Sequence, residues 1–270
     1  MPGSLMFPLM LFMTTLIASI VAWSLPAARR PALARELALL VTLFFTYFVL
    51  RGFTEGGLAI ALDHGRQLED LERSLRIFIE PELQEMILDT DWLVEGANLI
   101  YIWAHWPVLG AVAIWLYREH PTRYSAYRNA IVISGALGVL FFQFYPAAPP
   151  RLATPEIIGT VGQQAGYYEN FQPSFLSNEF AAVPSLHVGW SVLMGIALIR
   201  ESTHRWVQAI GVLMPLVMTW AVIVTGNHYI VDGVVGTVLS VGALAVITRN
   251  TRPARGAIGR FRRSPRTLAS

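Results

Sequence analysis

Apolar residues in this chain gather into long blocks, and polar residues are concentrated in the connections between them. About 20 apolar residues are enough for a helix to cross the hydrocarbon core of a bilayer. The pattern therefore predicts an all-α fold, a polytopic membrane helical bundle with six to seven transmembrane helices. The predicted apolar stretches are 5–25, 34–50, 92–117, 128–146, 186–199, 206–225 and 229–248. The fifth is short for a span, so we expect it to begin outside the hydrocarbon core, with His187 in its first turn.

The polar connections divide the chain into four regions. Residues 1–50 are predicted to form N-terminal transmembrane helices, since the stretch 5–25 lacks the basic residues that begin a signal peptide. Residues 51–91 form an outer-face amphipathic segment, and residues 92–248 form the membrane core that carries the candidate chemistry. Residues 249–270 are basic, lack an apolar period and are predicted to be a disordered cytoplasmic tail.

The segment 51–91 carries apolar residues at helical spacing between charged ones. These are Leu68, Leu71, Leu75, Phe78 and Ile79. Such a helix either lies on the outer membrane surface or packs on the protein's own outer domain, and the pattern alone does not separate the two.

Composition supports a membrane protein. Of the 270 residues, 54% are hydrophobic and 14% are charged, against about 25% charged in ordinary soluble domains. No cysteine is present, which excludes disulfides and thiolate metal sites. Every basic residue is an arginine, and most flank apolar stretches, so membrane orientation explains the basic pI better than a nucleic-acid partner. The high alanine and arginine content is typical of a GC-rich bacterial genome, so we expect a bacterial plasma membrane.

The arginines also predict an orientation. With the N-terminus outside, 15 of the 20 arginines are cytoplasmic, and so is the C-terminus. The same orientation places Arg151, His187 and His228 together on the outer face. Charge bias and the positions of these residues are independent observations, and they agree.

His228 and Asp232 are the first candidates for chemistry. A histidine with an aspartate four residues later shares one helix face with it, and a charged residue in a membrane helix is a functional candidate by default. If Asp232 accepts the Nδ1 proton of His228, Nε2 is free to act as a nucleophile. A buried pair with a purely structural role is the alternative.

His187 and Arg151 complete the candidate site. His187 follows Pro184 and Ser185 at a helix start, where free amides favour phosphate. Alone, such a histidine is more often an interface or core residue. Arg151 follows a proline run, and its guanidinium can bind two phosphate oxygens, although an arginine at a membrane edge often only snorkels. Together the residues predict a phosphoryl-transfer site with a histidine nucleophile and a histidine acid.

At these residues the chain resembles the type-2 phosphatidic acid phosphatase superfamily of membrane lipid phosphatases and phosphotransferases. The matching pieces are APPR, PSLH and HYIVD, in order and spacing, over roughly the third to seventh apolar stretches. The longer strings YPAAPPR, PSLHVGW and TGNHYIVD are most similar to the inositol phosphorylceramide synthase branch, an inositolphosphotransferase type. The resemblance implies a six-helix lipid phosphatase-like core and a reaction that needs no metal and no cofactor.

The resemblance also implies roles for the site residues. His228 would attack a lipid phosphate to form a phosphohistidine, and His187 would protonate the departing alcohol, then activate water or an acceptor alcohol. The wider family has two further cations at positions that are Phe144 and Val222 here, which leaves Arg151 as the evident phosphate ligand. Their absence argues against simple phosphatidic acid hydrolysis and favours the transferase branch. Hydrogen bonds from Ser185, Asn227 and the Gly226 amide are expected instead.

Three aromatic residues are candidates for the substrate cleft: His105, Tyr145 and Tyr229. For His105, a hydrogen-bonded core position is the main alternative. His64 lies in a charged stretch and is expected to be solvated. The long connection 147–184 is rich in aromatic residues that could cover a substrate, dip into lipid or only anchor the loop at the interface.

The sequence thus predicts a membrane enzyme that transfers or hydrolyses a lipid-linked phosphoryl group at the outer leaflet. Its expected partners are a phospholipid or lipid-linked phosphate, an acceptor alcohol and the bilayer. One alternative is a simple lipid phosphate phosphatase of the phosphatidic acid or isoprenyl phosphate type. Others are a transporter and a degenerate lipid-binding protein. Clustering of the charges at one membrane edge argues against transport, because transporter sites lie near the midplane.

Overall fold

The computed structural model describes residues 30–53, 57–163 and 178–250, and the regular elements in these ranges are all helical. This confirms the all-α membrane bundle. The elements are α2 (Arg30–Phe53), α3 (Leu58–Leu75), α4 (Glu80–Leu88), α5 (Asp91–Leu99), the π-helix η2 (Ile100–Ala104), α6 (His105–Glu119), α7 (Pro121–Phe144), α8 (Pro150–Ala153), α9 (Thr160–Gln163), α10 (Leu186–Glu201), α11 (Arg205–Val224) and α12 (Ile230–Asn250). The predicted span 5–25 and nearly all of the predicted tail 249–270 lie outside the described residues.

Four helical segments in the described ranges are long and apolar enough to cross a membrane. They are Asp91–Glu119, Pro121–Phe144, Arg205–Val224 and Ile230–Arg249. Each overlaps one of the predicted stretches, and the protein is therefore an integral membrane protein. As the sequence predicts, α10 is short, with 16 residues, and it places His187 in its first turn.

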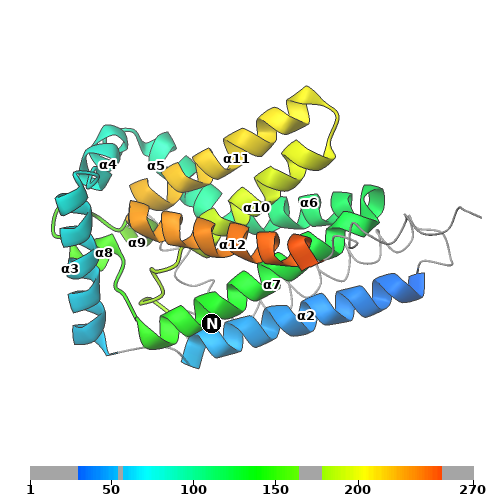
Figure 1. Cartoon of the computed structure of the whole chain (residues 1–270). Helices are drawn as coiled ribbons and strands as arrows, with labels where there is room; N and C mark the ends of the chain where they lie inside the picture. The colour runs from blue at the N-terminus through cyan, green and yellow to red at the C-terminus, as the bar shows by residue number, and fades with distance from the viewer. Residues whose placement is uncertain (1–29, 54–56, 164–177, 251–270) are drawn as a thin grey trace, which may run out of the picture.

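Helix α10 is the centre of the bundle and packs against α6, α7, α11 and α12 (Figure 1). Its side chains are buried almost throughout, with Leu193, Met194 and Ala197 at 1% exposure or less. A helix that is apolar all round is stable only inside protein or lipid. Since its neighbours surround it, α10 forms a rigid support for the residues at its N-terminus.

Glycines allow α10 to approach its neighbours at backbone distance. A Cβ added to Gly189 would overlap the carbonyl of Gly236, and a Cβ added to Gly236 would overlap the carbonyl of Ser185. The same relation links Gly195 of α10 to Gly211 of α11. Small residues at helix crossings are typical of membrane bundles, because packing contacts drive helix association there.

The polar segment 51–91 is not a single helix through Ile79, so that expectation is wrong. Helix α3 ends at Leu75 because Arg76 adopts a left-handed conformation, with φ of 58°. The amides of Arg76 and Ile77 bond back to Arg73 and Glu72, in the pattern of a helix C-cap. Helix α4 then begins at Glu80.

Helices α3 and α4 cover one end of the bundle. Helix α3 lies across this end and packs against α8 and α12, while α4 packs against α11 and α5 (Figure 1). The buried face of α3 carries Leu68 and Glu72. Helix α3 thus packs on the protein through Leu68 and Glu72, whereas Leu71 and Leu75 are 44% and 56% exposed, so the structure does not separate the two alternatives for this segment.

The close crossing of α10 and α12 makes a prediction about stability. Replacing Gly236 with alanine should destabilise the fold by about 1–3 kcal/mol, because the methyl group meets backbone that cannot yield. Gly242 of the same helix has no atom within 4 Å of an added Cβ. Its replacement with alanine should be neutral or stabilising by up to about 1 kcal/mol. Thermal unfolding of both variants in detergent measures the difference, and equal melting temperatures would contradict the packing described.

Candidate active site

His228 lies in the tight connection between α11 and α12, not within a helix. Helix α11 ends at Val224, the chain turns at Gly226 with φ of +71°, and α12 begins at Ile230. The expectation that His228 and Asp232 share a helix face is therefore wrong, because His228 precedes the helix. Its side chain is nevertheless buried, with the residue at 5% exposure.

Asp232 reaches His228 through a helix cap. As the third residue of α12, it accepts the backbone N–H of Tyr229 at 2.9 Å, as in a capping box. The same oxygen, Oδ2, lies 3.3 Å from Nδ1 of His228. The carboxylate thus holds both the start of the helix and the histidine that precedes it.

A second acceptor for His228 comes from a backbone group that sequence reasoning missed. Nδ1 of His228 lies 2.9 Å from the carbonyl oxygen of Ala182, closer than to Asp232. Ala182 is held in place by a bridge between its strand-like segment and Ala147. With a proton on Nδ1, both acceptors are satisfied and Nε2 is left without a proton, as a nucleophile requires.

The structure brings His187 and His228 together. Their ring centroids are 6.1 Å apart. His187 also contacts the rings of Tyr101, at 4.9 Å, and His105, at 4.7 Å. Tyr101, on η2, was not among the predicted site residues. The two histidines are close enough for one phosphoryl group to contact both.

Arg151 is held beside this pair by the turn that carries His228. Its Nη1 donates to Oδ1 of Asn227 at 2.6 Å, and its backbone N–H donates to the carbonyl of Gly226 at 3.0 Å. Burial lowers the pKa of Arg151 from its ordinary value, while Tyr101 and Glu179 act in the opposite direction. An arginine keeps its charge in proteins, so the turn that carries His228 also holds a half-buried cation.

The three predicted hydrogen-bond donors differ in availability. The N–H of Gly226 already donates to Ile223 at 2.8 Å, so the expectation that it binds phosphate is not supported. The side-chain NH₂ group of Asn227 donates to Oγ1 of Thr225 at 2.8 Å, so Asn227 orients Arg151 instead. Oγ of Ser185 is buried without a hydrogen-bond partner in the described part of the chain. Ser185 is the N-cap residue of α10, but its side chain makes no capping hydrogen bond to the helix.

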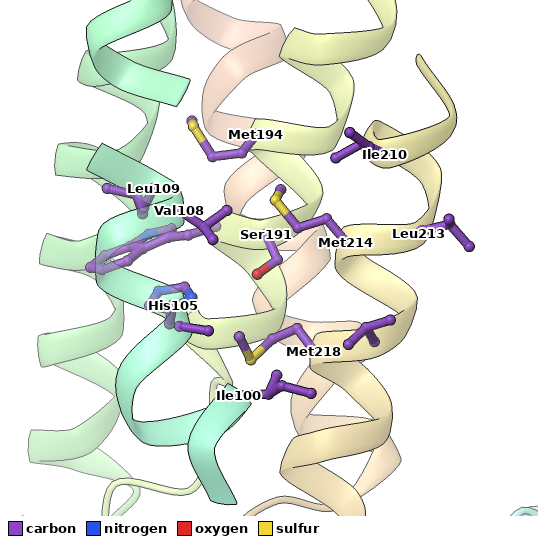
Figure 2. A pocket seen from close by; sticks show the side chains of 13 residues that line it. Ile100, His105, Val108, Leu109, Ser191, Met194, Ile210, Leu213, Met214 and Met218 are labelled. Carbon is purple, nitrogen blue, oxygen red and sulfur yellow. The ribbon is translucent and has the colours of Figure 1, made fainter. Parts of the chain in front are cut away.

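An apolar cavity of about 260 Å³ lies next to the histidines, between η2, α6, α10 and α11. In Figure 2, His105 and Ser191 are the polar side chains among an apolar lining that includes Met214 and Met218. The ring of His105 thus lines the cavity and also contacts the ring of His187. The part of the cavity lining that belongs to α11 includes Leu213, which is 56% exposed.

The other two predicted cleft residues do not line this cavity. Tyr229 is 1% exposed and packs in a buried cluster with Leu68 and Val183. Tyr145 stacks on His64 with 4.0 Å between ring centroids. His64 also bonds the carbonyl of Pro146 at 2.8 Å, so the expectation that it is solvated is wrong.

The structure thus defines an integral membrane protein with a histidine-centred polar site at one end of a helical bundle. Comparison with protein families gives the more specific class, because the model described as the PAP2 superfamily matches residues 66–246. The chain belongs to the PAP2 superfamily, a family of membrane lipid phosphatases and phosphotransferases. The matched range contains every site residue described above.

The chain is also similar to a curated protein from a bacterium. A phosphoinositol dihydroceramide synthase from Bacteroides thetaiotaomicron is 26% identical to this chain over 155 residues, which are 52% of this chain and 50% of the relative. The chain thus spans about half the length of the curated relative it matches. No solved structure matches this chain.

The position of Arg151 predicts anion binding. Orthovanadate is expected to inhibit enzymatic turnover by binding at the site as a phosphate analogue. Replacing Arg151 with glutamine should weaken this inhibition about 10- to 100-fold, the effect of losing one charge-assisted hydrogen-bonding group. Replacing Asn227 with alanine should weaken it less, because the cation stays but loses its anchor. Arg73, which pairs with Glu69 on the surface, provides the control as Arg73→Gln. Unchanged inhibition of the Arg151 variant would remove Arg151 from the site.

Proposed function

We propose that this protein is a membrane lipid phosphotransferase that acts through a phosphohistidine on His228. The observation that carries the proposal is the approach of two histidine rings to 6.1 Å, with Nδ1 of His228 held by Ala182 and Asp232. A nucleophile whose other ring nitrogen is fixed in this way, with a second histidine in reach, suits a double displacement at phosphorus.

In the first step, Nε2 of His228 attacks the phosphorus of a phospholipid or lipid-linked phosphate. The bond to the leaving alcohol breaks, and protonated His187 gives its proton to that alcohol. Arg151 stabilises the charge that develops on the phosphoryl oxygens. Positive charge that forms on the His228 ring is balanced by Asp232 and by the Ala182 carbonyl.

In the second step, His187 has lost its proton and acts as a base. It takes the proton of an acceptor alcohol, whose oxygen attacks the phosphohistidine and releases His228. If water takes the place of the acceptor, the same residues perform hydrolysis. The steps proposed here use protein side chains alone.

Two observations favour transfer over hydrolysis. The relative from Bacteroides is named a phosphoinositol dihydroceramide synthase, and the positions where the wider family has two more cations are apolar here. Val222 is 1% exposed in the bundle, and Phe144 is 79% exposed at the end of α7. We therefore infer a phosphodiester-forming reaction of the inositolphosphotransferase type, with a simple lipid phosphate phosphatase as the alternative.

We also propose an orientation from the distribution of arginine. Most arginines flank the ends of the spans opposite to the site. Since cytoplasmic loops carry an excess of basic residues, the site faces the outer side of a bacterial plasma membrane, and the C-terminus is cytoplasmic.

Removal of the nucleophile tests the mechanism. His228→Ala should lower turnover by at least about 1,000-fold and abolish labelling of the protein by a donor that carries a radioactive phosphoryl group. His187→Ala should also lower turnover. Part of this variant should still be labelled, because the breakdown of the phosphohistidine in the second step is slowed as well. Wild-type turnover by the His228 variant would overturn the mechanism. Supplying donor with and without an acceptor alcohol then distinguishes new phosphodiester from free phosphate, and phosphate as the sole product would reject the transferase.

The cavity beside His105 predicts where a hydrocarbon chain of the lipid lies. Met214→Trp would fill the cavity and should lower kcat/KM for a long-chain donor about 10-fold or more, with little effect on a short-chain analogue. Leu216→Trp on the same helix is the control, because Leu216 is 60% exposed and does not line the cavity. Equal losses on long and short chains would contradict this placement.

A further inference from the structure

Two buried glutamates reach the start of α12 from the helices that cover the site. Oε1 of Glu72, on α3, accepts the backbone N–H of Val231 at 2.7 Å. Oε1 of Glu80, the first residue of α4, accepts the N–H of Ile230 at 3.0 Å. Both glutamates have 0% exposure. Neither belongs to the histidine site, and the proposed mechanism does not use them.

With Asp232, these glutamates satisfy three successive amides. The N–H groups of Tyr229, Ile230 and Val231 each donate to one carboxylate oxygen, supplied by α12 itself, α4 and α3 respectively. The first N–H groups of a helix have no partner within the helix, and negative charge is favourable there. The turn that follows His228 is therefore fixed by two other elements as well as by its own aspartate.

The remaining oxygens of the two glutamates lack such partners. Oε2 of Glu72 and Oε2 of Glu80 are buried and accept no hydrogen bond from the described residues. The two carboxyl groups nevertheless lie next to each other, because they bond to the amides of adjacent residues, Ile230 and Val231. Two ionised carboxylates have no hydrogen between them, so one proton is what turns this contact into a hydrogen bond and satisfies both oxygens.

The surroundings favour that proton. Burial and the hydrogen bond with Glu80 raise the pKa of Glu72 above its ordinary value, and nearby Asp232 acts in the same direction. At the start of α12, the titratable groups that face the two glutamates are Tyr229, His228 and Asp232. Glu69 of α3 is paired with Arg73. In the described ranges no arginine forms an ion pair with either buried glutamate.

We propose that Glu72 and Glu80 are positioning residues that hold one proton between them, and in that state fix the first turn of α12 and so the orientation of the His228–Asp232 pair. The catalytic part of this statement rests on the proposed function, since it takes His228 as the nucleophile. Removing the shared proton places two full negative charges side by side next to Asp232. The pair then repels itself, and its hold on Ile230 and Val231 loosens.

The shared proton gives stability a defined dependence on pH. A carboxyl whose pKa is raised in the folded state binds its proton more tightly there than in the unfolded chain. Its contribution is complete below the ordinary carboxyl pKa, and it is lost as the pH rises through the folded value. Glutamine in place of Glu72 mimics the protonated partner, because its amide donates to Glu80 and its carbonyl accepts from Val231, and it does not titrate.

The first experiment measures thermal unfolding in detergent from acidic to alkaline pH, in the His228→Ala background. The added change Glu72→Gln should remove part of the alkaline loss and raise the melting temperature at high pH by about 2–4 °C or more. The added change Glu82→Gln, at an exposed position of α4, should follow the parent. If the Glu72 variant also follows the parent at every pH, there is no shared proton. Because thermal unfolding is measured without substrate, the result does not depend on the proposed reaction.

The second experiment measures phosphoryl transfer against pH. Glu72→Ala should lower kcat about 10-fold or more with KM little changed, whereas Glu72→Gln should restore most of the turnover and move the alkaline decline of kcat to higher pH. A glutamine variant as impaired as the alanine variant would overturn the proton-sharing pair. Wild-type turnover and pH profile in both variants would overturn the positioning role. If wild-type protein transfers no phosphoryl group while the stability result holds, the proposed function fails and the carboxyl pair stands.

Discussion

The first turn of α12 imposes the strongest constraint on this structure. Backbone N–H groups at the edge of a membrane core have little access to water, and each one left without a partner costs several kcal/mol. Asp232 satisfies one of them locally, but the others depend on Glu72 and Glu80. Helices α3 and α4 must therefore fold over the end of the bundle, and this same requirement decides where His228 lies.

The residues of the candidate site belong to connections and helix ends, and each one bonds to a backbone group. Arg151 bonds the carbonyl of Gly226, His228 bonds the carbonyl of Ala182, and Ser185 bonds the carbonyl of Asp232 through its own amide. The helical bundle that carries these residues is rigid, because glycines let α10 and α12 pack at backbone distance. A site built in this way combines fixed placement of loop residues with a core that is held mainly by apolar contacts.

Much of this architecture could be predicted from the sequence. The lengths of the apolar stretches predicted α11, and α7 apart from its polar first turns, to within a few residues. The distribution of arginine predicted that His187 and His228 lie on the same face. The carbonyl of Ala182 could not be predicted, because a backbone group carries no residue-specific signal. Glu72 resembles any charged position of an amphipathic helix, and its burial depends on an amide 159 positions away. Such long-range pairing is decided by tertiary structure and not by local pattern.

The shortness of α10 has a consequence for the depth of the reaction. At about 1.5 Å per residue its 16 residues span about 24 Å, whereas a typical hydrocarbon core is about 30 Å thick. In the orientation that we propose, Arg200 lies at the cytoplasmic interface, and His187 at the other end of α10 then lies several ångströms below the opposite headgroup layer. For the proposed reaction, a polar headgroup must then sink toward the acyl region, or the bilayer must thin around the protein, before a lipid phosphate meets the histidines. Bilayer thickness is thus a physical variable of this site, set by the length of a single helix.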